Sequence, residues 1–130
     1  MFDPRQATVV IIDDDDGLRE SLEALLQAVD YQCVSYASAE AYLAHPAPAP
    51  PSCLLVDLHL SGMTGLELQD EISRARHQPP ILFISGHASA HEIDRAIASG
   101  AQDFLHKPFD PEELLDCTAS CLRHSLNGAG

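Results

Sequence analysis

The sequence predicts an α/β fold in which a parallel sheet of five strands lies between two layers of helices. Three observations predict it. Residues 8–12 form a continuous β-branched run, as expected for a strand that is covered on both faces. From Leu18 onward the apolar residues recur every three or four positions, which is the period of a helix. This change of period occurs five times, and parallel strands need crossover connections that are usually helical.

Capping residues help to place the helices in this pattern. Asp15 and Asp16 stand where the first helix begins, and carboxylates there accept hydrogen bonds from free N–H groups and complement the helix dipole. Ser38 caps the second helix, and Asp110 and Pro111 begin the last one. The expected strands are 8–12, 32–36, 53–57, 81–84 and 103–105, and the expected helices are about 18–30, 38–44, 64–74, 89–98 and 111–122.

The length of 130 residues fits a single domain, with its core at about 8–122 and a short flexible tail at 123–130. We interpret the Pro- and Ser-rich residues 45–52 as a surface loop, since too few residues precede them for a domain of their own. No apolar run approaches the roughly 18 residues of a membrane span, and no signal peptide is recognisable. We therefore expect a cytoplasmic protein without membrane contact.

The charge and the cysteines exclude several functions. A net charge of −13, with only seven Lys and Arg residues, argues against direct binding to nucleic acid or to an anionic membrane. Cys33, Cys53, Cys117 and Cys121 lack C-x-x-C spacing. In a reducing compartment we expect them to be small apolar core residues and not zinc ligands or disulfides.

Polar residues at the ends of the predicted strands define a candidate site. Ligands of such sheets bind beyond the carboxyl ends of the strands. Asp13 and Asp14 follow the first strand and Asp57 ends the third, while Ser85 follows the fourth and Lys107 follows the fifth. Three carboxylates, one hydroxyl and one ammonium group are therefore expected to converge at one edge of the sheet.

Gathered carboxylates need a cation. Two like charges about 4 Å apart repel by about 1 kcal/mol in water and by about 4 kcal/mol at an effective dielectric near 20. Lys107 supplies one positive charge, and Mg²⁺ suits the remaining all-oxygen ligand set and binds phosphate as well. Asp57 is the candidate nucleophile for an aspartyl-phosphate because it stands alone at its strand end, whereas Asp13 and Asp14 form a pair suited to metal binding.

Several short motifs together resemble the receiver domains of bacterial two-component response regulators, over residues 8 to 122. They are Ile12-Asp13-Asp14, Leu55-Val56-Asp57-Leu58, Gly62-Met63-Thr64-Gly65, Ile84-Ser85-Gly86-His87 and Phe104-Leu105-His106-Lys107-Pro108-Phe109. The resemblance implies a doubly wound, flavodoxin-like sheet of strand order 2-1-3-4-5 with five helices on its two faces. The last two motifs look most like the subgroup whose members often carry a C-terminal helix-turn-helix domain.

The resemblance also implies roles for the site residues. Asp57 would accept a phosphoryl group from a sensor histidine kinase. Mg²⁺, with Mn²⁺ as an alternative, would be ligated by Asp14, Asp57 and the backbone carbonyl of His59, with Asp13 acting mainly through water. Lys107 would pair with the phosphoryl group. Beyond this self-catalysed phosphotransfer and a slow dephosphorylation, no enzymatic activity is expected.

The switch that follows phosphorylation is likewise implied by the family. Ser85 would move toward the phosphoryl group, and the ring of Phe104 would swing inward behind it. This movement reshapes the face of the fourth helix, fifth strand and fifth helix, and in the family it often promotes dimerisation. The sequence does not identify the cognate kinase, the output pathway, the oligomeric state, or whether the chain acts alone or with a separate DNA-binding domain.

The loop after Asp57 departs from the family pattern. Leu60-Ser61 replaces the usual Met-Pro, which should loosen the loop after Asp57. The side chain of His59 should be free, either to tune the access of water to the acyl phosphate or as a solvated surface group.

Two other functions stay open beside a kinase-dependent receiver, which could be stand-alone or part of a hybrid kinase. They are a small phosphatase and a binding module with a degenerate site. A phosphatase would want a second acid where His59 stands, and an intact set of site residues counts against degeneracy.

Overall fold

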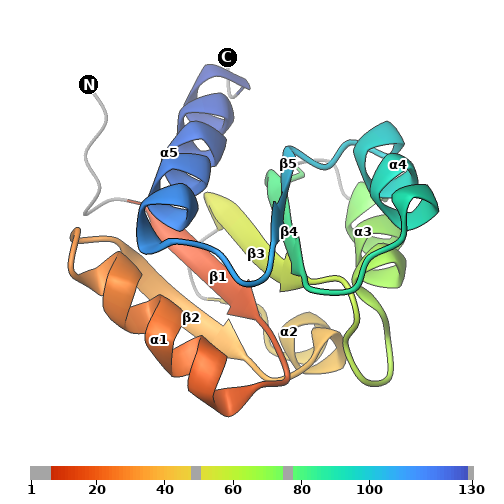
Figure 1. The fold of residues 1–130 in the computed structure, drawn as a ribbon, viewed down its shortest axis with the longest axis horizontal. Helices are drawn as coiled ribbons and strands as arrows, with labels where there is room; N and C mark the ends of the chain where they lie inside the picture. The colour runs from red at the N-terminus through yellow and green to blue at the C-terminus, as the bar shows by residue number, and fades with distance from the viewer. Residues whose placement is uncertain (1–6, 48–50, 75–77, 129–130) are drawn as a thin grey trace.

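The computed structural model describes residues 7–47, 51–74 and 78–128 and contains a single five-stranded sheet within them (Figure 1). All strand pairs are parallel, and the order is β2-β1-β3-β4-β5, so the predicted fold class is confirmed. The elements in chain order are β1 (Thr8–Ile12), α1 (Asp16–Gln27), β2 (Gln32–Tyr36), α2 (Ala39–Ala44), β3 (Cys53–Asp57), α3 (Gly65–Ser73), β4 (Ile81–Ser85), α4 (Ala90–Ala98), β5 (Asp103–His106) and α5 (Pro111–Gly128).

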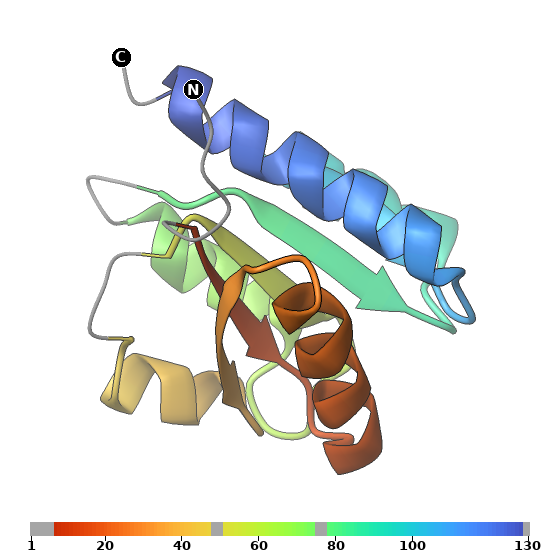
Figure 2. The ribbon, with the colours of Figure 1, turned by 90° about the vertical axis from the view of Figure 1, so that its left-hand side faces the viewer.

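Each face of the sheet has its own apolar core. Because side chains alternate along a strand, Val9 and Ile11 of β1 face one side, where they pack with residues of α1 and α5. Val10 and Ile12 face the other side, where they pack with residues of α2, α3 and α4. Figures 1 and 2 show the two helix layers on either side of the sheet. Burial on both faces explains why the sequence of this strand is continuously apolar, with each such side chain contributing about 1.5–3 kcal/mol.

Side-chain caps set the starts of four helices. Asp15 accepts a hydrogen bond from the backbone N–H of Leu18 at 3.1 Å, and Ser38 accepts one from Ala41 at 3.0 Å, as the sequence predicts. The helices α3 and α4 begin with reciprocal capping boxes, formed by Thr64 with Glu67 and by Ser89 with Glu92. These caps fix where each helix begins relative to the strand before it.

Some element ends differ from the prediction. The ladder between β4 and β5 continues to the pair Ser85 and His106, so Ser85 ends β4 instead of following it. α1 ends at Gln27, before the predicted Asp30, which has a positive φ of 71° that does not continue a helix. α5 continues past the predicted end at Leu122 to Gly128. Part of the predicted loop at 45–52 and the last two residues lie outside the described residues.

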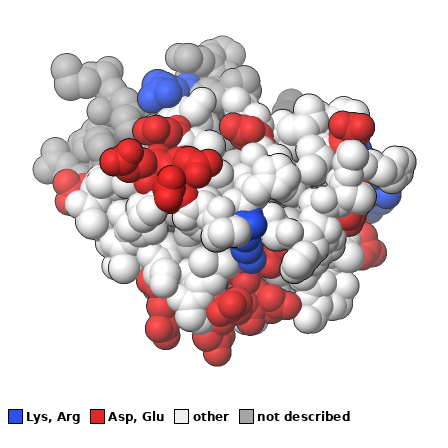
Figure 3. Space-filling view, in the orientation of Figure 1, with Lys and Arg blue, Asp and Glu red and all other residues white. Residues whose placement is uncertain are grey.

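The charge of the surface, the character of the helices and the state of the cysteines can be compared with the expectations from composition. Acidic side chains predominate over basic ones on the face in Figure 3, in keeping with the net charge of −13. No helix in the described ranges has the length and apolar character that a membrane crossing requires. The four cysteines form no disulfide, and Cys53 and Cys121 are fully buried with their sulfur atoms 3.0 Å apart. Burial raises the pKa of the Cys53 thiol well above its ordinary value.

Candidate functional site

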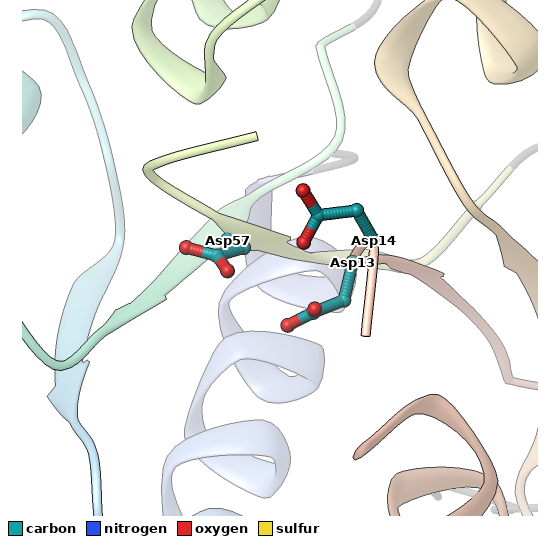
Figure 4. Close-up of side chains that lie close together, drawn as sticks. All are labelled: Asp13, Asp14 and Asp57. Carbon is teal, nitrogen blue, oxygen red and sulfur yellow. The ribbon is translucent and has the colours of Figure 1, made fainter. Parts of the chain in front are cut away.

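Three carboxylates meet beyond the carboxyl ends of two neighbouring strands. Asp13 and Asp14 come directly after β1, and Asp57 is the last residue of β3, which pairs with β1 (Figure 4). One oxygen atom from each carboxylate lies within 4.8 Å of the others. Asp13 and Asp57 are buried, at 2% and 8% exposure, whereas Asp14 is exposed. The sequence predicted this convergence from the positions of these residues at strand ends, together with the strand order that the resemblance implies.

Lys107 provides the positive charge that faces the two buried carboxylates. Its Nζ atom lies 3.3 Å from Asp13 Oδ2 and 3.2 Å from Asp57 Oδ2. Burial by itself would lower the pKa of Lys107, but the charges of Asp13 and Asp57 hold that pKa above its ordinary value. The pKa of Asp13 is also raised, because burial outweighs the hydrogen bond from Asp15 and the charge of Lys107. One ammonium group is therefore too little for three carboxylates, and their hard oxygen atoms fit a divalent cation such as Mg²⁺.

The backbone around the site holds the carboxylates in place. Asp13 Oδ1 accepts from the N–H of Asp15 at 2.9 Å, and the side chain of Arg19 in α1 donates to the carbonyl of Asp13 at 2.6 Å. Asp57 Oδ1 accepts from the N–H of His59 at 3.0 Å. Arg19 also pairs with Asp16, so the two extra acids of the run serve helix α1 and not the cluster.

The loop after Asp57 is tied to the acidic cluster through Ser61, which stands where the family usually has Pro. The backbone N–H and the hydroxyl of Ser61 both donate to Asp14 Oδ2, at 3.2 and 2.9 Å. Proline has no N–H and could make neither bond. Farther along the loop, the N–H of Met63 donates to Glu40 Oε2 of α2 at 3.1 Å. Hydrogen bonds therefore hold this loop at two places, and its looseness relative to a loop with proline stays a prediction.

The side chain of His59 is 41% exposed, in keeping with the expected surface position, but both of its ring nitrogens have partners. Nδ1 lies 3.2 Å from Ser85 Oγ, and Nε2 lies 2.9 Å from Glu92 Oε2. The pKa of Glu92 is lowered, first by the backbone N–H of Ser89 and then by His59. The spacing of Ser89 and Glu92 is a capping-box signature, but it indicates the start of a helix, so sequence reasoning missed Glu92 as a neighbour of the site.

A surface pocket opens beside these groups. Its lining includes, from three neighbouring strand ends, Asp57, His59, Ser85, His87, Lys107 and Pro108. Ser85 is 2% exposed and its Oγ atom accepts from the N–H of His87 at 3.3 Å. Phe104 lies apart from the pocket on β5, partly buried on the face that α2, α3 and α4 cover, with its ring 5.1 Å from that of His106. The structure therefore gathers every predicted polar side chain at one edge of the sheet, whereas Phe104 lies outside the pocket.

Comparison with known proteins gives the family to which this fold and this edge belong. Residues 9–119 match the family model of the response regulator receiver domain. The chain therefore belongs to the receiver domain family of two-component response regulators. The signalling role expected from the resemblance is confirmed at this level.

Individual relatives agree with the family. Nodulation protein W of Bradyrhizobium diazoefficiens is 39% identical over 115 residues, which are 88% of this chain and 51% of that protein. Transcriptional regulatory protein FixJ of Azorhizobium caulinodans is 33% identical over 122 residues, 94% of this chain and 58% of that protein. The structure of response regulator StyR matches with a TM-score of 0.86 and 33% identity, over 95% of this chain and 62% of that one. The crystal structure of FixJ-N matches with a TM-score of 0.84 and 30% identity, over 95% and 97%. The chain spans about half the length of the curated relatives.

Proposed function

We propose that this chain is a phosphoacceptor receiver in which Asp57 takes a phosphoryl group from a sensor histidine kinase. The observation that carries the proposal is the setting of Asp57, buried at the end of β3 with one oxygen on Lys107 and beside a surface pocket. In the transfer, a carboxylate oxygen of Asp57 would attack phosphorus, a P–O bond would form, and the P–N bond to the kinase histidine would break.

The other residues of the cluster would neutralise charge during this transfer. Lys107 would pair with a phosphoryl oxygen. Mg²⁺, or Mn²⁺ in its place, would be held by Asp14, Asp57 and the carbonyl of His59, with Asp13 acting through water. When bound, the metal ion supplies positive charge to the oxygens of the phosphoryl group. The hard oxygen donors of the three gathered carboxylates support this assignment.

The output would follow from a change of shape. Ser85 would move toward the phosphoryl group, Phe104 would swing inward, and the face formed by α4, β5 and α5 would change and favour a homodimer. The names of several relatives, such as the transcriptional regulatory proteins FixJ and TdiR, support control of transcription through another protein or domain. The charge of −13 supports protein partners over direct binding to nucleic acid or a membrane. The proposed location of this signalling step is the cytoplasm.

Intact mass spectrometry after incubation with acetyl phosphate and Mg²⁺ tests the proposal. The native chain should gain one phosphoryl group, and the Asp57→Asn variant and a sample with EDTA should gain none. Asp30→Asn, an exposed aspartate with a positive φ that asparagine also tolerates, is the matched control and should gain the group. No gain in the native chain would instead indicate a binding module with an inactive site. Release of phosphate over many turnovers would indicate a phosphatase.

A further inference from the structure

We propose that His59 is a positioning residue that holds the Ser85 hydroxyl in the unphosphorylated state, and that a phosphoryl group on Asp57 has to take this hydroxyl from it. The inference rests on the proposed function, since it concerns the competition between two acceptors for one switch residue. It assigns to the side chain of His59 a role distinct from that of its backbone carbonyl.

The direction of the hydrogen bonds follows from the partners. An ionised carboxylate can only accept, so the contact of 2.9 Å between Glu92 Oε2 and His59 Nε2 places a proton on Nε2. In a neutral imidazole the other nitrogen is then an acceptor. With the ring neutral, Nδ1 therefore accepts a hydrogen bond from the hydroxyl of Ser85, whose oxygen lies 3.2 Å away. The Ser85 oxygen in turn accepts from the N–H of His87, so the hydroxyl proton points at His59.

A serine hydroxyl has one proton, and this makes the competition exclusive. The oxygens of a dianionic phosphoryl group only accept hydrogen bonds, so Ser85 can donate to the phosphoryl group only after leaving His59. Ser85 is 2% exposed but the side chain of His59 is 41% exposed, so water can take the place of the hydroxyl at Nδ1 and only the net contribution of one hydrogen bond is lost. A typical net hydrogen bond corresponds to a factor of about two to ten in an equilibrium constant. The phosphorylated state should be disfavoured by a factor of that size.

Glu92 carries the restraint to α4. Its Oε1 atom accepts from the N–H of Ser89 in the capping box at 2.9 Å, while Oε2 faces His59. The chain of contacts from Ser85 through His59 to Glu92 therefore joins the end of β4, the loop after Asp57 and the first turn of α4. If Ser85 moved away, His59 would lose its hydrogen bond to Ser85 and keep only its contact with Glu92. Glu92 lies on α4, at the edge of the face that is proposed to change.

Beryllofluoride, a tetrahedral mimic of a phosphoryl group on a carboxylate, provides the test. The concentration for half-saturation is measured by ¹H–¹⁵N NMR in Mg²⁺ at pH 8. His59→Leu keeps the backbone carbonyl and should tighten binding by about two- to tenfold. His91→Leu, an exposed histidine of α4 in the same structure, is the matched control and should bind as the native chain does.

Two further variants separate this role from a merely structural one. In a Ser85→Ala background the effect of His59→Leu should vanish, because the contested hydroxyl is absent. Glu92→Gln, which preserves a residue type suited to the capping box, removes the charge that fixes the Nε2 proton and should tighten binding by a smaller factor. It also serves if His59→Leu does not fold. In the native chain, long-range ¹H–¹⁵N spectra should show the Nε2–H form of His59, with a shift of Nδ1 on addition of beryllofluoride.

The outcomes distinguish this inference from the function on which it rests. If the native chain does not bind beryllofluoride, the proposed function fails and this inference fails with it. If the native chain binds but His59→Leu binds equally or more weakly, or if its gain persists without Ser85, only the positioning role is overturned.

Discussion

Asp13 shows at the scale of one residue that Lys107 alone does not balance the charge of the carboxylates. Its side chain is 2% exposed, and burial raises its pKa above the ordinary 3.8 despite the nearby Lys107. The folded chain therefore holds the Asp13 proton more tightly than the unfolded chain does. Its contribution to stability is present below about pH 3.8 and is lost as the pH rises through the folded-state value. At neutral pH the ionised group destabilises the chain.

The first prediction is that Asp13→Asn increases the free energy of unfolding in EDTA at pH 7, by about 1 kcal/mol, because one of the mutually repelling carboxylates is removed. Mg²⁺ should stabilise the native chain strongly and the variant much less. Urea denaturation with and without Mg²⁺ measures both effects. A variant that is less stable in EDTA and gains as much from Mg²⁺ as the native chain would contradict this account.

The second prediction concerns the two hydrogen bonds from Ser61 to Asp14. Groups that orient a metal ligand typically change the metal affinity by a factor of ten or more when they are removed. Ser61→Ala removes the bond from the hydroxyl and leaves the one from the N–H, so we expect Mg²⁺ binding to weaken by up to about tenfold in calorimetric titration. Ser73→Ala, an exposed serine that bonds to a carbonyl of α3, is the control. Equal or tighter binding after loss of Ser61 would show that its hydroxyl does not orient Asp14.

Ser61 and His59 also mark the limit of sequence reasoning at this scale. Residues at strand ends could be placed together because all parallel strands end at one edge of the sheet. The partners of His59 and Ser61 depend instead on side-chain rotamers. For His59 they depend also on the first turn of α4, where Glu92 lies 33 positions after His59 in the chain. Periodicity carries no information on such pairs, so neither set of contacts was predicted.

At the scale of the element, the N-terminus of α3 packs directly against β3, the strand that ends in Asp57. A Cβ atom on Gly65 would lie 2.8 Å from the carbonyl oxygen of Asp57 and 3.0 Å from Leu58 Cα and Phe83 Cε1. Two of these atoms belong to the backbone and cannot rotate away. Only glycine lets the helix begin this close to Asp57.

The third prediction is therefore that Gly65→Ala lowers the free energy of unfolding by about 1–3 kcal/mol, as overpacking usually does, and slows phosphorylation by acetyl phosphate. Gly17→Ala is the matched control, because a Cβ atom there would meet only Asp15 Oδ1, at 3.5 Å, and alanine favours a helix. This control should be as stable as the native chain or more so. Urea denaturation of both variants decides the matter, and two equal stabilities would refute the steric account.

The elements themselves were largely predictable, and their ends less so. The apolar runs located β1, β3 and β4, which are buried along their whole length, whereas the alternation of strands and helices located the partly buried edge strands β2 and β5. Ser38 and Asp15 cap their helices as expected. The end of β4 was missed by one residue because Ser85 is polar but still pairs with His106. The end of α5 was missed because a Gly-containing stretch was taken as the end of helical order.

At the scale of the whole molecule, the strand order decides which residues meet. Alternating strands and helices predicted a parallel sheet, but they did not by themselves place β1 between β2 and β3. That order came with the resemblance to receiver domains, and it brings Asp13 and Asp57 side by side. Local patterns thus determined the layers, while the family pattern was needed for the topology.

The fourth prediction concerns the proposed dimer face. Ile97 of α4 is 46% exposed, and burying such a side chain in an interface contributes about 1.5–3 kcal/mol. We expect sedimentation velocity to show a dimer that forms only with Mg²⁺ and beryllofluoride, and Ile97→Asp to weaken it by about tenfold or more. Leu43→Asp is the control, because Leu43 is similarly exposed, at 39%, but lies on α2 beside the opposite edge strand β2. If both variants weaken the dimer equally, the interface is not formed by α4, and a dimer that forms without beryllofluoride would remove phosphorylation as its cause.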